Sequence, residues 1–539
     1  MMYLGNNEYV KGVCVENTVD LIKEKEAKVL VTQVGAGSEP LSLGSESVLA
    51  PAGVQKDRSI SIEQIIWGFE HGVVPAALTN HSDMMCEDFR EALEKNSEMT
   101  MLPNEKICPT GDEHGEYLVI DVGGSTLRIA IVEIKPPGDS DENDDREKRI
   151  NLVSERQWTV ENSVKVMDLK FFRWIAKNAK ETLAYREDFV SGKCKLKTGI
   201  SWSFPLEMTS HSSGNILFAG KGYTISQEVY GKDLKYILES VFLESYGLQI
   251  DIKSIVNDSL ATYAAGAFLD KNMKLAMVLG TGLNACCLIK TDSIHEKKRL
   301  DSDYVLLNSE LSFFGRDLIS LSNKFDTMID SHFDYRNTKL PYKPHMELDT
   351  LTKEIFQPLE LMTSGRYIVE LVRSIIVDLI EGGNIFQKVH LGMSHVIYKR
   401  YDGLSGELVC SISESDDITF LRKRIVKYMG WNPNDIDDAD IINLKLIVDC
   451  VIKRAAYLMA ITIVAFIKLM HINNDGSKSD VFKVGFVGSV LAHFKKYRNT
   501  VLEFVNEDSL VKSLGLKVGF KSLVESSIIG TAISAAYFS

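Results

Sequence analysis

The sequence predicts an α/β protein with two lobes. Two segments share the order apolar run, glycine turn, apolar run: YLVIDVGGSTLRIAIVEI at 117–134 and LAMVLGTGLNACCLIK at 275–290. Apolar, β-branched runs joined by small residues are typical of strand hairpins. Helix-like segments at 168–186 and 226–246 lie between the two. Hairpins followed by helices favour an α/β architecture built from two halves.

The organisation of the rest of the chain follows from local patterns. At about 100–200 residues per domain, the length allows about two to four domains. Residues 1–57 carry Gly-Ser clusters and are predicted to form a poorly ordered arm. From Ser59, apolar residues repeat at helical spacing, which predicts helices that pack on a core. The proline-led, acidic stretch 135–149 is predicted to be a solvated loop before a third strand at 150–160.

Composition argues against several classes of protein. The 539 residues include 74 Asp and Glu against 61 Lys and Arg, a formal charge of −13, without a basic run. Nucleic-acid binding needs clustered cations, so we expect no nucleic-acid partner. The 8 cysteines form no CxxC pair and the N-terminal residues do not resemble a signal peptide, which predicts a cytoplasmic protein. The apolar stretch 455–467 is shorter than the about 20 residues of a bilayer span, so we expect a buried core helix and no membrane span.

Both glycine turns offer what a phosphate chain needs, because glycine lets the backbone approach an anion and exposed N–H groups can point at it. The residues are Gly123, Gly124, Ser125 and Thr126 in the first turn and Gly280, Thr281 and Gly282 in the second. Asp121 could hold Mg²⁺ through water, and Arg128 adds a cation. One such turn is more often a plain turn, so the inference depends on the pair. Neither has the spacing of a Walker loop or of a dinucleotide fingerprint.

A candidate general base follows the apolar run DIKSIV. Asp258 stands beside Asn257, where a strand end would deliver polar side chains into a cleft. The alternative is that Asp258 or Ser259 caps a helix over 260–268, and the segment alone favours the cap. Other polar residues are, taken singly, more typical of turns and surfaces: Ser203, Lys221, Glu310 and Glu360. His and Cys show no metal-ligand spacing, and the sequence has no G-x-S-x-G elbow.

The order of the short motifs carries more information than any one of them. The chain contains, in sequence, DVGGSTLR, SWSFP, GKGY, IVNDS, GTGLN, NSELSFFG, LELMTSGRY, FVGSV and SSIIGTA. This order resembles the hexokinase family of ATP-dependent sugar kinases, from about Ser59 to the C-terminus. The segments GDEHGEYLVIDVGGSTLRIA, SWSFPLE and SSIIGTAISAAY are most similar to the fungal N-acetylglucosamine kinases.

The resemblance implies an actin-like (ribonuclease H-like) fold, with a cleft between a small and a large lobe that close around the sugar. It also implies direct transfer of the ATP γ-phosphate to a sugar 6-hydroxyl, with Mg²⁺. The expected domains are the arm 1–57, a helical segment 58–112 on the large lobe, the small lobe 113–257, the large lobe 258–522 and a C-terminal helix 523–539 that returns to the small lobe.

Residue roles follow from the same resemblance. Asp258 would be the base that accepts the 6-hydroxyl proton, while Asn257 and Lys221 would hold ring hydroxyls. The remaining sugar contacts would be Ser203, Phe204, Gly220, Asn284, Glu310 and Glu360. The phosphates would lie on Asp121, Gly123, Gly124, Ser125, Thr126, Arg128, Gly280, Thr281 and Gly282. Gly488 and Ser489 match the adenosine motif of the family.

Three departures from the family pattern bear on the ligands. Glucose-using hexokinases usually have Thr-Lys-Gly where this chain has Gly220-Lys221-Gly222, and we expect the missing side chain to leave room for a C2 acetamido group. Val487 stands where an Asp is common and Ile528 where a Gly is common, which bears on ATP affinity. The base, both phosphate turns and the acidic sugar contacts are kept, so an active enzyme is expected.

The resemblance therefore predicts an ATP-dependent N-acetylglucosamine kinase that makes N-acetylglucosamine 6-phosphate and ADP in amino-sugar catabolism. Two alternatives stay open: a glucose or broad-specificity hexokinase, and a sugar sensor or regulator with the same fold but no useful turnover. The motifs do not indicate whether the protein is a monomer or an oligomer.

Overall fold

The structure is a computed structural model. It describes residues 60–95, 100–105, 107–124, 126–138, 145–161, 165–204, 206–217, 223–330, 357–470 and 481–539. The chain divides into two units, 1–57 and 58–539, and all the described residues belong to the second. The predicted arm 1–57 and three predicted site residues, Ser125, Gly220 and Lys221, lie outside the described residues.

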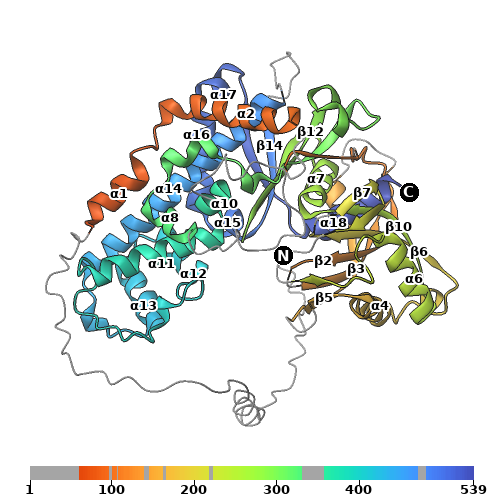
Figure 1. Ribbon diagram of the computed structural model, residues 1–539, viewed down its shortest axis with the longest axis horizontal. Coiled ribbons are helices and arrows are strands. Elements are labelled where there is room, and N and C mark those ends of the chain that lie inside the picture. The colour runs from red at the N-terminus through yellow and green to blue at the C-terminus, as the bar shows by residue number, and fades with distance from the viewer. Residues whose placement is uncertain are drawn as a thin grey trace, which may run out of the picture. The chain divides into compact units, whose positions relative to one another are not determined.

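The first sheet contains the first glycine turn (Figure 1). Its strands lie in the order β10 (Gln249–Val256), β6 (Lys195–Trp202), β2 (Gly115–Val122), β3 (Thr126–Ile134) and β4 (Ile150–Thr159). The strands β2, β6 and β10 are parallel, whereas β3 is antiparallel to both β2 and β4. The predicted hairpin at 117–134 and the predicted strand at 150–160 are therefore confirmed.

The second sheet contains the second glycine turn. Its order is β1 (Leu102–Asn104), β13 (Tyr304–Asn308), β12 (Leu283–Lys290), β11 (Met273–Leu279), β14 (Val481–Val487) and β15 (Lys517–Ser522). The predicted hairpin at 275–290 is confirmed as β11 and β12, and β14 and β15 add to β11 in parallel. Two short ribbons pair β5 (Val166–Met167) with β9 (Thr224–Ile225) and β7 (Leu206–Ser210) with β8 (Ser213–Ile216).

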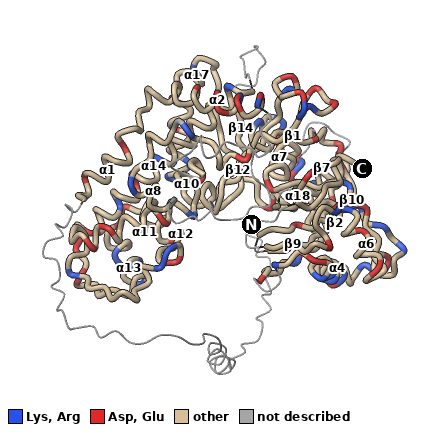
Figure 2. Tube along the Cα trace, viewed as in Figure 1, with Lys and Arg blue, Asp and Glu red and all other residues tan. Residues whose placement is uncertain are grey.

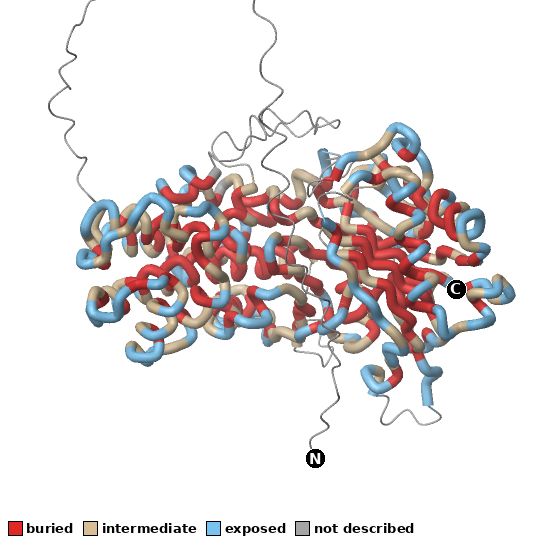
Figure 3. The backbone as a smooth tube through the Cα atoms, turned by 90° about the horizontal axis from the view of Figure 1, so that it is seen from below, coloured by how far each residue is buried: buried red, intermediate tan, exposed pale blue. Residues whose placement is uncertain are grey.

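The two faces of the first sheet pack on different helices, as the period of two in a strand requires. Leu118 and Ile120 of β2 join a buried cluster with α4 (Leu169–Thr182) and α6 (Leu234–Tyr246). Tyr117 and Val119 face the opposite way and join a cluster with α7 (Asp258–Leu269) and α18 (Ser526–Tyr537). Figure 3 shows this buried interior as a continuous red layer between exposed outer segments.

The helices α7 and α18 connect the two sheets. The helix α18 packs on β2, β6 and β10 of the first sheet, and α7 packs on β11 and β12 of the second. The two helices also pack on each other, so closely that a Cβ at Gly530 would lie 1.8 Å from the carbonyl oxygen of Ala261. On its other side α18 approaches β6, where a Cβ at Gly199 would lie 2.6 Å from the Thr531 oxygen. Glycine at these positions is therefore required by packing.

The helix α14 (Asp438–Leu469) is the core of the helical region. Around it lie α1 (Ile62–Glu70), α2 (Leu78–Glu94), α8 (Lys324–Asp330), α10 (Pro358–Thr363), α11 (Gly365–Glu381), α12 (Gly406–Glu414), α13 (Ile418–Met429) and α16 (Lys495–Glu507). By length and composition alone α14 could cross a membrane, but its most apolar window is 94% buried among these helices. The predicted core helix at 455–467 is confirmed as part of α14. Arg454 of α14 donates to both carboxylate oxygens of Asp326 on α8, at 2.6 and 2.8 Å, with both side chains wholly buried.

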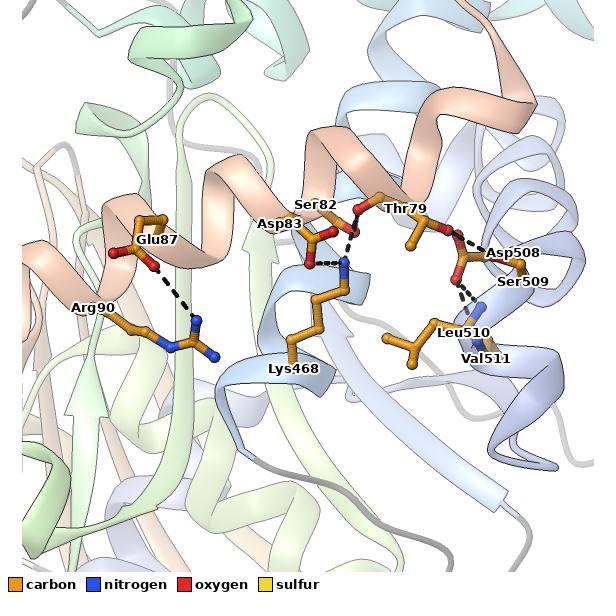
Figure 4. A network of polar contacts seen from close by, with 10 residues as sticks. All are labelled: Thr79, Ser82, Asp83, Glu87, Arg90, Lys468, Asp508, Ser509, Leu510 and Val511. Carbon is orange, nitrogen blue, oxygen red and sulfur yellow. Dashed lines mark hydrogen bonds and ion pairs between the residues drawn. The ribbon is translucent and has the colours of Figure 1, made fainter.

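Polar contacts fix α2 on the end of α14 (Figure 4). Lys468 donates to Asp83 at 2.6 Å and to the Thr79 carbonyl at 2.7 Å. The Thr79 hydroxyl donates to Asp508 at 2.6 Å, and Asp508 caps the short helix α17 (Ser509–Ser513). The helices expected after Ser59 thus pack on a core, with Phe89 of α2 wholly buried.

Two local expectations were wrong. The helix predicted at 226–246 begins only at Leu234, because Gly231 has φ +70° and Asp233 caps the helix by accepting the Tyr236 N–H. The stretch predicted as a solvated loop ends in one helical turn, α3 (Arg146–Arg149). Arg149 is only 6% exposed and donates to the carbonyls of residues 111, 113 and 135, so the charge is buried by satisfying backbone acceptors.

The crossing of α7 and α18 predicts a difference between two helical glycines. Gly530→Ala should lower the free energy of unfolding by about 1–3 kcal/mol, because the added methyl meets backbone that cannot move aside cheaply. Gly68→Ala, in the helix α1 with nothing within 4 Å of the new Cβ, should raise stability by about 0.5–1 kcal/mol. Denaturant unfolding of both variants measures this, and equal effects would contradict the close crossing.

Candidate active site

The candidate base lies at the first turn of α7. Asn257 is the residue that caps this helix, since its side-chain oxygen accepts the Leu260 N–H at 2.9 Å. The expectation that Asp258 or Ser259 could be the cap was therefore wrong by one or two positions. Asp258 is half-buried at the first helical position, where the helix dipole favours a negative charge.

A polar network runs from the cap of α7 to the end of β13. The Ser259 hydroxyl lies 3.0 Å from the Asn257 oxygen and 3.1 Å from the Asn308 oxygen. The Asn308 amide donates to Glu310 at 2.7 Å, and the Asn284 amide donates to Asn308 at 3.0 Å. The structure thus brings together three predicted sugar contacts, Asn257, Asn284 and Glu310, beside the candidate base.

The two acidic candidates are held in defined positions. Glu310 has φ +49°, a left-handed conformation that a non-glycine residue keeps only where its surroundings impose it, as at functional sites. Glu360 accepts the Leu283 N–H at 2.9 Å. A Cβ at Gly282 would lie 2.8 Å from the same carboxylate, so glycine at 282 lets Glu360 reach the second turn.

The end of β6 places the next two candidates beside the first glycine turn. Ser203 donates its N–H to the Val122 carbonyl at 3.1 Å. Phe204 is 6% exposed and its ring lies 4.8 Å from that of Tyr223, which donates to the Gly123 carbonyl at 3.3 Å. Burial raises the pKa of Tyr223 to about 12, so this hydroxyl stays protonated and remains a donor.

Asp121 and Arg128 face each other across the first hairpin and form an ion pair. Arg128 donates to Asp121 at 2.7 and 2.9 Å and to Glu525 at 2.6 Å. Glu155 lies 4.0 Å from the same guanidinium, and burial, followed by the charge of Glu525, raises the pKa of Glu155. The assignment of Asp121 to Mg²⁺ and of Arg128 to phosphate stays a prediction, and both groups would have to share this network.

The second glycine turn lies against Gly488, one of the two residues expected to contact adenosine. Gly488 has φ +112°, and a Cβ there would lie 2.3 Å from the Leu279 carbonyl oxygen. The Gly365 N–H donates to the Gly280 carbonyl at 2.8 Å, which ties α11 to the same turn. Segments far apart in sequence therefore converge at Gly280.

A cavity of about 700 Å³ lies at this convergence. It is lined by Gly280 and Thr281, by the start of α11, by α12 and by α15 (Ser489–His493). Its volume falls within the about 300–1,000 Å³ of small-molecule sites. Of the described candidates, the structure gathers Gly280, Thr281 and Ser489 here, whereas Asp258 and Glu310 are not among the lining residues.

Two residues were missed although quoted motifs contain them. Asn308 opens NSELSFFG and connects the base segment to Glu310. Arg366 lies in LELMTSGRY and lines the cavity. An Arg directly after Ser-Gly at a helix start was the available signal, but only the fold shows that this helix start abuts the second glycine turn.

Comparisons with known proteins identify relatives of the chain. Two family models described as Hexokinase match residues 70–268 and 274–537. The chain is 45% identical over 486 residues to N-acetylglucosamine kinase 1 of Candida albicans, which covers 90% of this chain and 95% of that protein. It is 27% identical over 423 residues to Hexokinase-3 of Oryza sativa subsp. japonica, covering 76% of each.

Solved structures show the same fold. The hexokinase from Schistosoma mansoni complexed with glucose matches with a TM-score of 0.67 at 20% identity, covering 88% of this chain and all of that one. A second hexokinase crystal structure gives a TM-score of 0.68 at 19% identity, over 88% and 99%. The predicted two-domain sugar-kinase fold is confirmed, and with two matching family models and a 45% identical relative the chain belongs to the hexokinase family of sugar-phosphorylating enzymes.

Proposed function

We propose that the protein transfers the γ-phosphate of ATP to the 6-hydroxyl of N-acetylglucosamine, giving N-acetylglucosamine 6-phosphate and ADP in amino-sugar catabolism. The observation that carries the choice of sugar is the 45% identity over 90% of the chain to the Candida albicans kinase named for it. The polar network beside Asp258 supports a sugar site, because it gathers amide and carboxylate groups that bind hydroxyls.

Asp258 is the proposed base. As the 6-oxygen forms its bond to the γ-phosphorus and the bond to the ADP oxygen breaks, Asp258 accepts the hydroxyl proton. Asn257 is the N-cap of α7, so the Asp258 carboxylate is not needed to cap the helix. The cap fixes the backbone at the position where the base is needed.

Asn284 and Glu310 are proposed to bind sugar hydroxyls. Asn308, 5% exposed, donates to the Glu310 carboxylate at 2.7 Å, and Asn284 donates to the same oxygen at 3.4 Å. These amides would orient the carboxylate toward ring hydroxyls, which are donors that a carboxylate accepts. The assignments of Ser203, Phe204, Gly220, Lys221 and Glu360 to the sugar follow from the motifs and remain proposals of the same kind.

The cavity beside Gly280 fits the nucleotide. The Gly280 N–H donates within the turn to the Gly282 carbonyl at 3.0 Å, so the following N–H groups of the turn, the Ser489 hydroxyl and the Arg366 guanidinium would contact an adenosine polyphosphate. Among the described residues that line the cavity, Arg366 is the only Lys or Arg, so we assign it to the phosphates. Mg²⁺, which ATP would bring, would neutralise phosphate charge, with Asp121 as its proposed partner through water.

The proposed location is the cytoplasm. Cysteines in the described residues are free thiols, and a reducing compartment favours that state. Figure 2 shows acidic and basic residues interspersed along the described chain.

The central test is an ADP-release assay with N-acetylglucosamine, glucose, glucosamine and mannose on the native chain and on Asp258→Asn. Loss of the base should lower kcat by about 10²- to 10⁴-fold, with little change in the sugar KM or the melting temperature. Asp270→Asn, the same change at the other end of α7, should keep the native kcat. Native kcat in Asp258→Asn would refute the mechanism, and faster turnover of glucose than of N-acetylglucosamine would favour a broad hexokinase. A folded native chain that makes no ADP with any of these sugars would favour the sensor.

Gly220→Thr tests the space for the acetamido group. The added side chain should lower kcat/KM for N-acetylglucosamine relative to glucose by about tenfold or more, as expected for filling a pocket by a few atoms. Glucosamine, which lacks the acetyl group, should follow glucose. An unchanged ratio between N-acetylglucosamine and glucose would show that residue 220 does not determine the choice of sugar.

A further inference from the structure

A buried ion pair on α11 holds the loop that follows this helix. Arg373 donates to both oxygens of Glu370, at 2.6 and 2.8 Å, and the two residues are 6% and 1% exposed. The same Arg373 donates to the Ile397 carbonyl at 2.8 Å. A two-pronged pair that also binds backbone is a rigid anchor, because moving the loop would expose a charge without its partner.

Tyr401 is fixed by this anchor in an unfavourable backbone conformation. Its N–H donates to Glu370 at 2.8 Å, and its φ is +64°, which a residue with a Cβ adopts only when its surroundings impose it. Its hydroxyl is buried and has no hydrogen-bond partner among the described residues. The anchor to Glu370 thus holds the backbone of Tyr401, and the part of its side chain that contacts Arg366 is the ring rather than the hydroxyl.

The Tyr401 ring lies under the guanidinium of Arg366. The distance from the guanidinium carbon to the ring centroid is 4.6 Å, within the about 6 Å of a cation–π contact. Arg366, Glu370 and Arg373 are spaced by four and three residues, so one face of α11 carries both the anchor and the cation.

Arg366 contacts this ring and lines the same cavity as the second glycine turn. It lines the cavity with Gly280 and Thr281, and the N–H of its neighbour Gly365 donates to Gly280. Two carboxylates, Glu407 and Glu414, also line the cavity. An exposed Arg in such surroundings has many rotamers and nearby acidic alternatives, so its effect on a polyphosphate depends on what holds it in place.

We propose that Tyr401 is a positioning residue for the nucleotide: its ring, locked by Glu370 and Arg373, holds Arg366 toward the phosphates of a nucleoside di- or triphosphate. The inference rests on the proposed nucleotide site and adds a residue that does not itself contact the nucleotide. Tyr401 acts on binding before chemistry, so it affects the KM for ATP and leaves kcat and the sugar KM unchanged.

The experiment compares Tyr401→Leu with Tyr401→Phe and Tyr398→Leu in the full chain. Tyr401→Leu should raise the KM for ATP, and the Kd of ADP measured by calorimetry, by about two- to fivefold, the factor expected for one exposed cation–π contact. Tyr401→Phe keeps the ring and should restore native binding, since the hydroxyl has no partner. Tyr398→Leu makes the same change three positions earlier in the loop and should leave both values unchanged.

A double-mutant cycle with Arg366→Ala separates positioning from general loosening of the loop. In the Arg366→Ala background, Tyr401→Leu should have no further effect on ADP binding. Additive effects, or a native Kd in Tyr401→Leu, would overturn the inference. A rise in the sugar KM together with a lower melting temperature would also overturn it, because that pattern means a structural role.

The measurement of ADP binding tests this inference independently of the proposed function. A native chain that binds ADP through Arg366 and Tyr401 but phosphorylates none of the sugars would refute the function and support the positioning role. If the native chain phosphorylates N-acetylglucosamine while Tyr401→Leu binds ADP normally, the proposed function is supported and the positioning role is refuted.

Discussion

The close crossing of α7 and α18 is the constraint on which the site depends. The helix α7 packs on the second sheet and begins with the candidate base, whereas α18 packs on the first sheet. Because Gly530 allows α18 to touch the backbone of Ala261, the two helices behave as one packed unit. Glu525, at the start of α18, reaches Arg128 beside the first glycine turn. A shift at the crossing would therefore move the base and the first turn together.

Several polar side chains around the base make more than one hydrogen bond each. Asn257 caps α7 and contacts Ser259, which in turn contacts Asn308, and Asn308 orients Glu310. In a partly buried site each such contact also avoids an unpaired polar atom, which would be costly. The network thus connects the Glu310 carboxylate, which follows β13, to the start of α7.

The local sequence pattern was sufficient to predict secondary structure where a segment's own apolar residues and glycines determine it. Both hairpins, the strand β4 and the apolar part of α14 at 455–467 could be predicted from apolar runs and glycine turns. Helix starts were less predictable: α6 begins late because Asp233 caps it, and Asn257 rather than Asp258 caps α7. The roles of Asn308 and Arg366 needed the fold, because each depends on a neighbour far away in sequence. A buried Arg149 in a charged run shows the same limit, since composition cannot reveal a partner carbonyl.

The net negative charge of the chain makes the cations near the two glycine turns important for binding an anion. Arg128 stands beside the first glycine turn, but its charge is already opposed by Asp121, Glu525 and Glu155. These pairs connect β3 to the start of α18, and a phosphate at this turn would need N–H groups and hydroxyls in addition to Arg128. At the second turn Arg366 contacts the Tyr401 ring, and the carboxylates of Glu407 and Glu414 line the same cavity. In the proposed positioning role, the ring would hold the cation without neutralising it, so an acidic protein could keep a positive charge at the proposed nucleotide cavity.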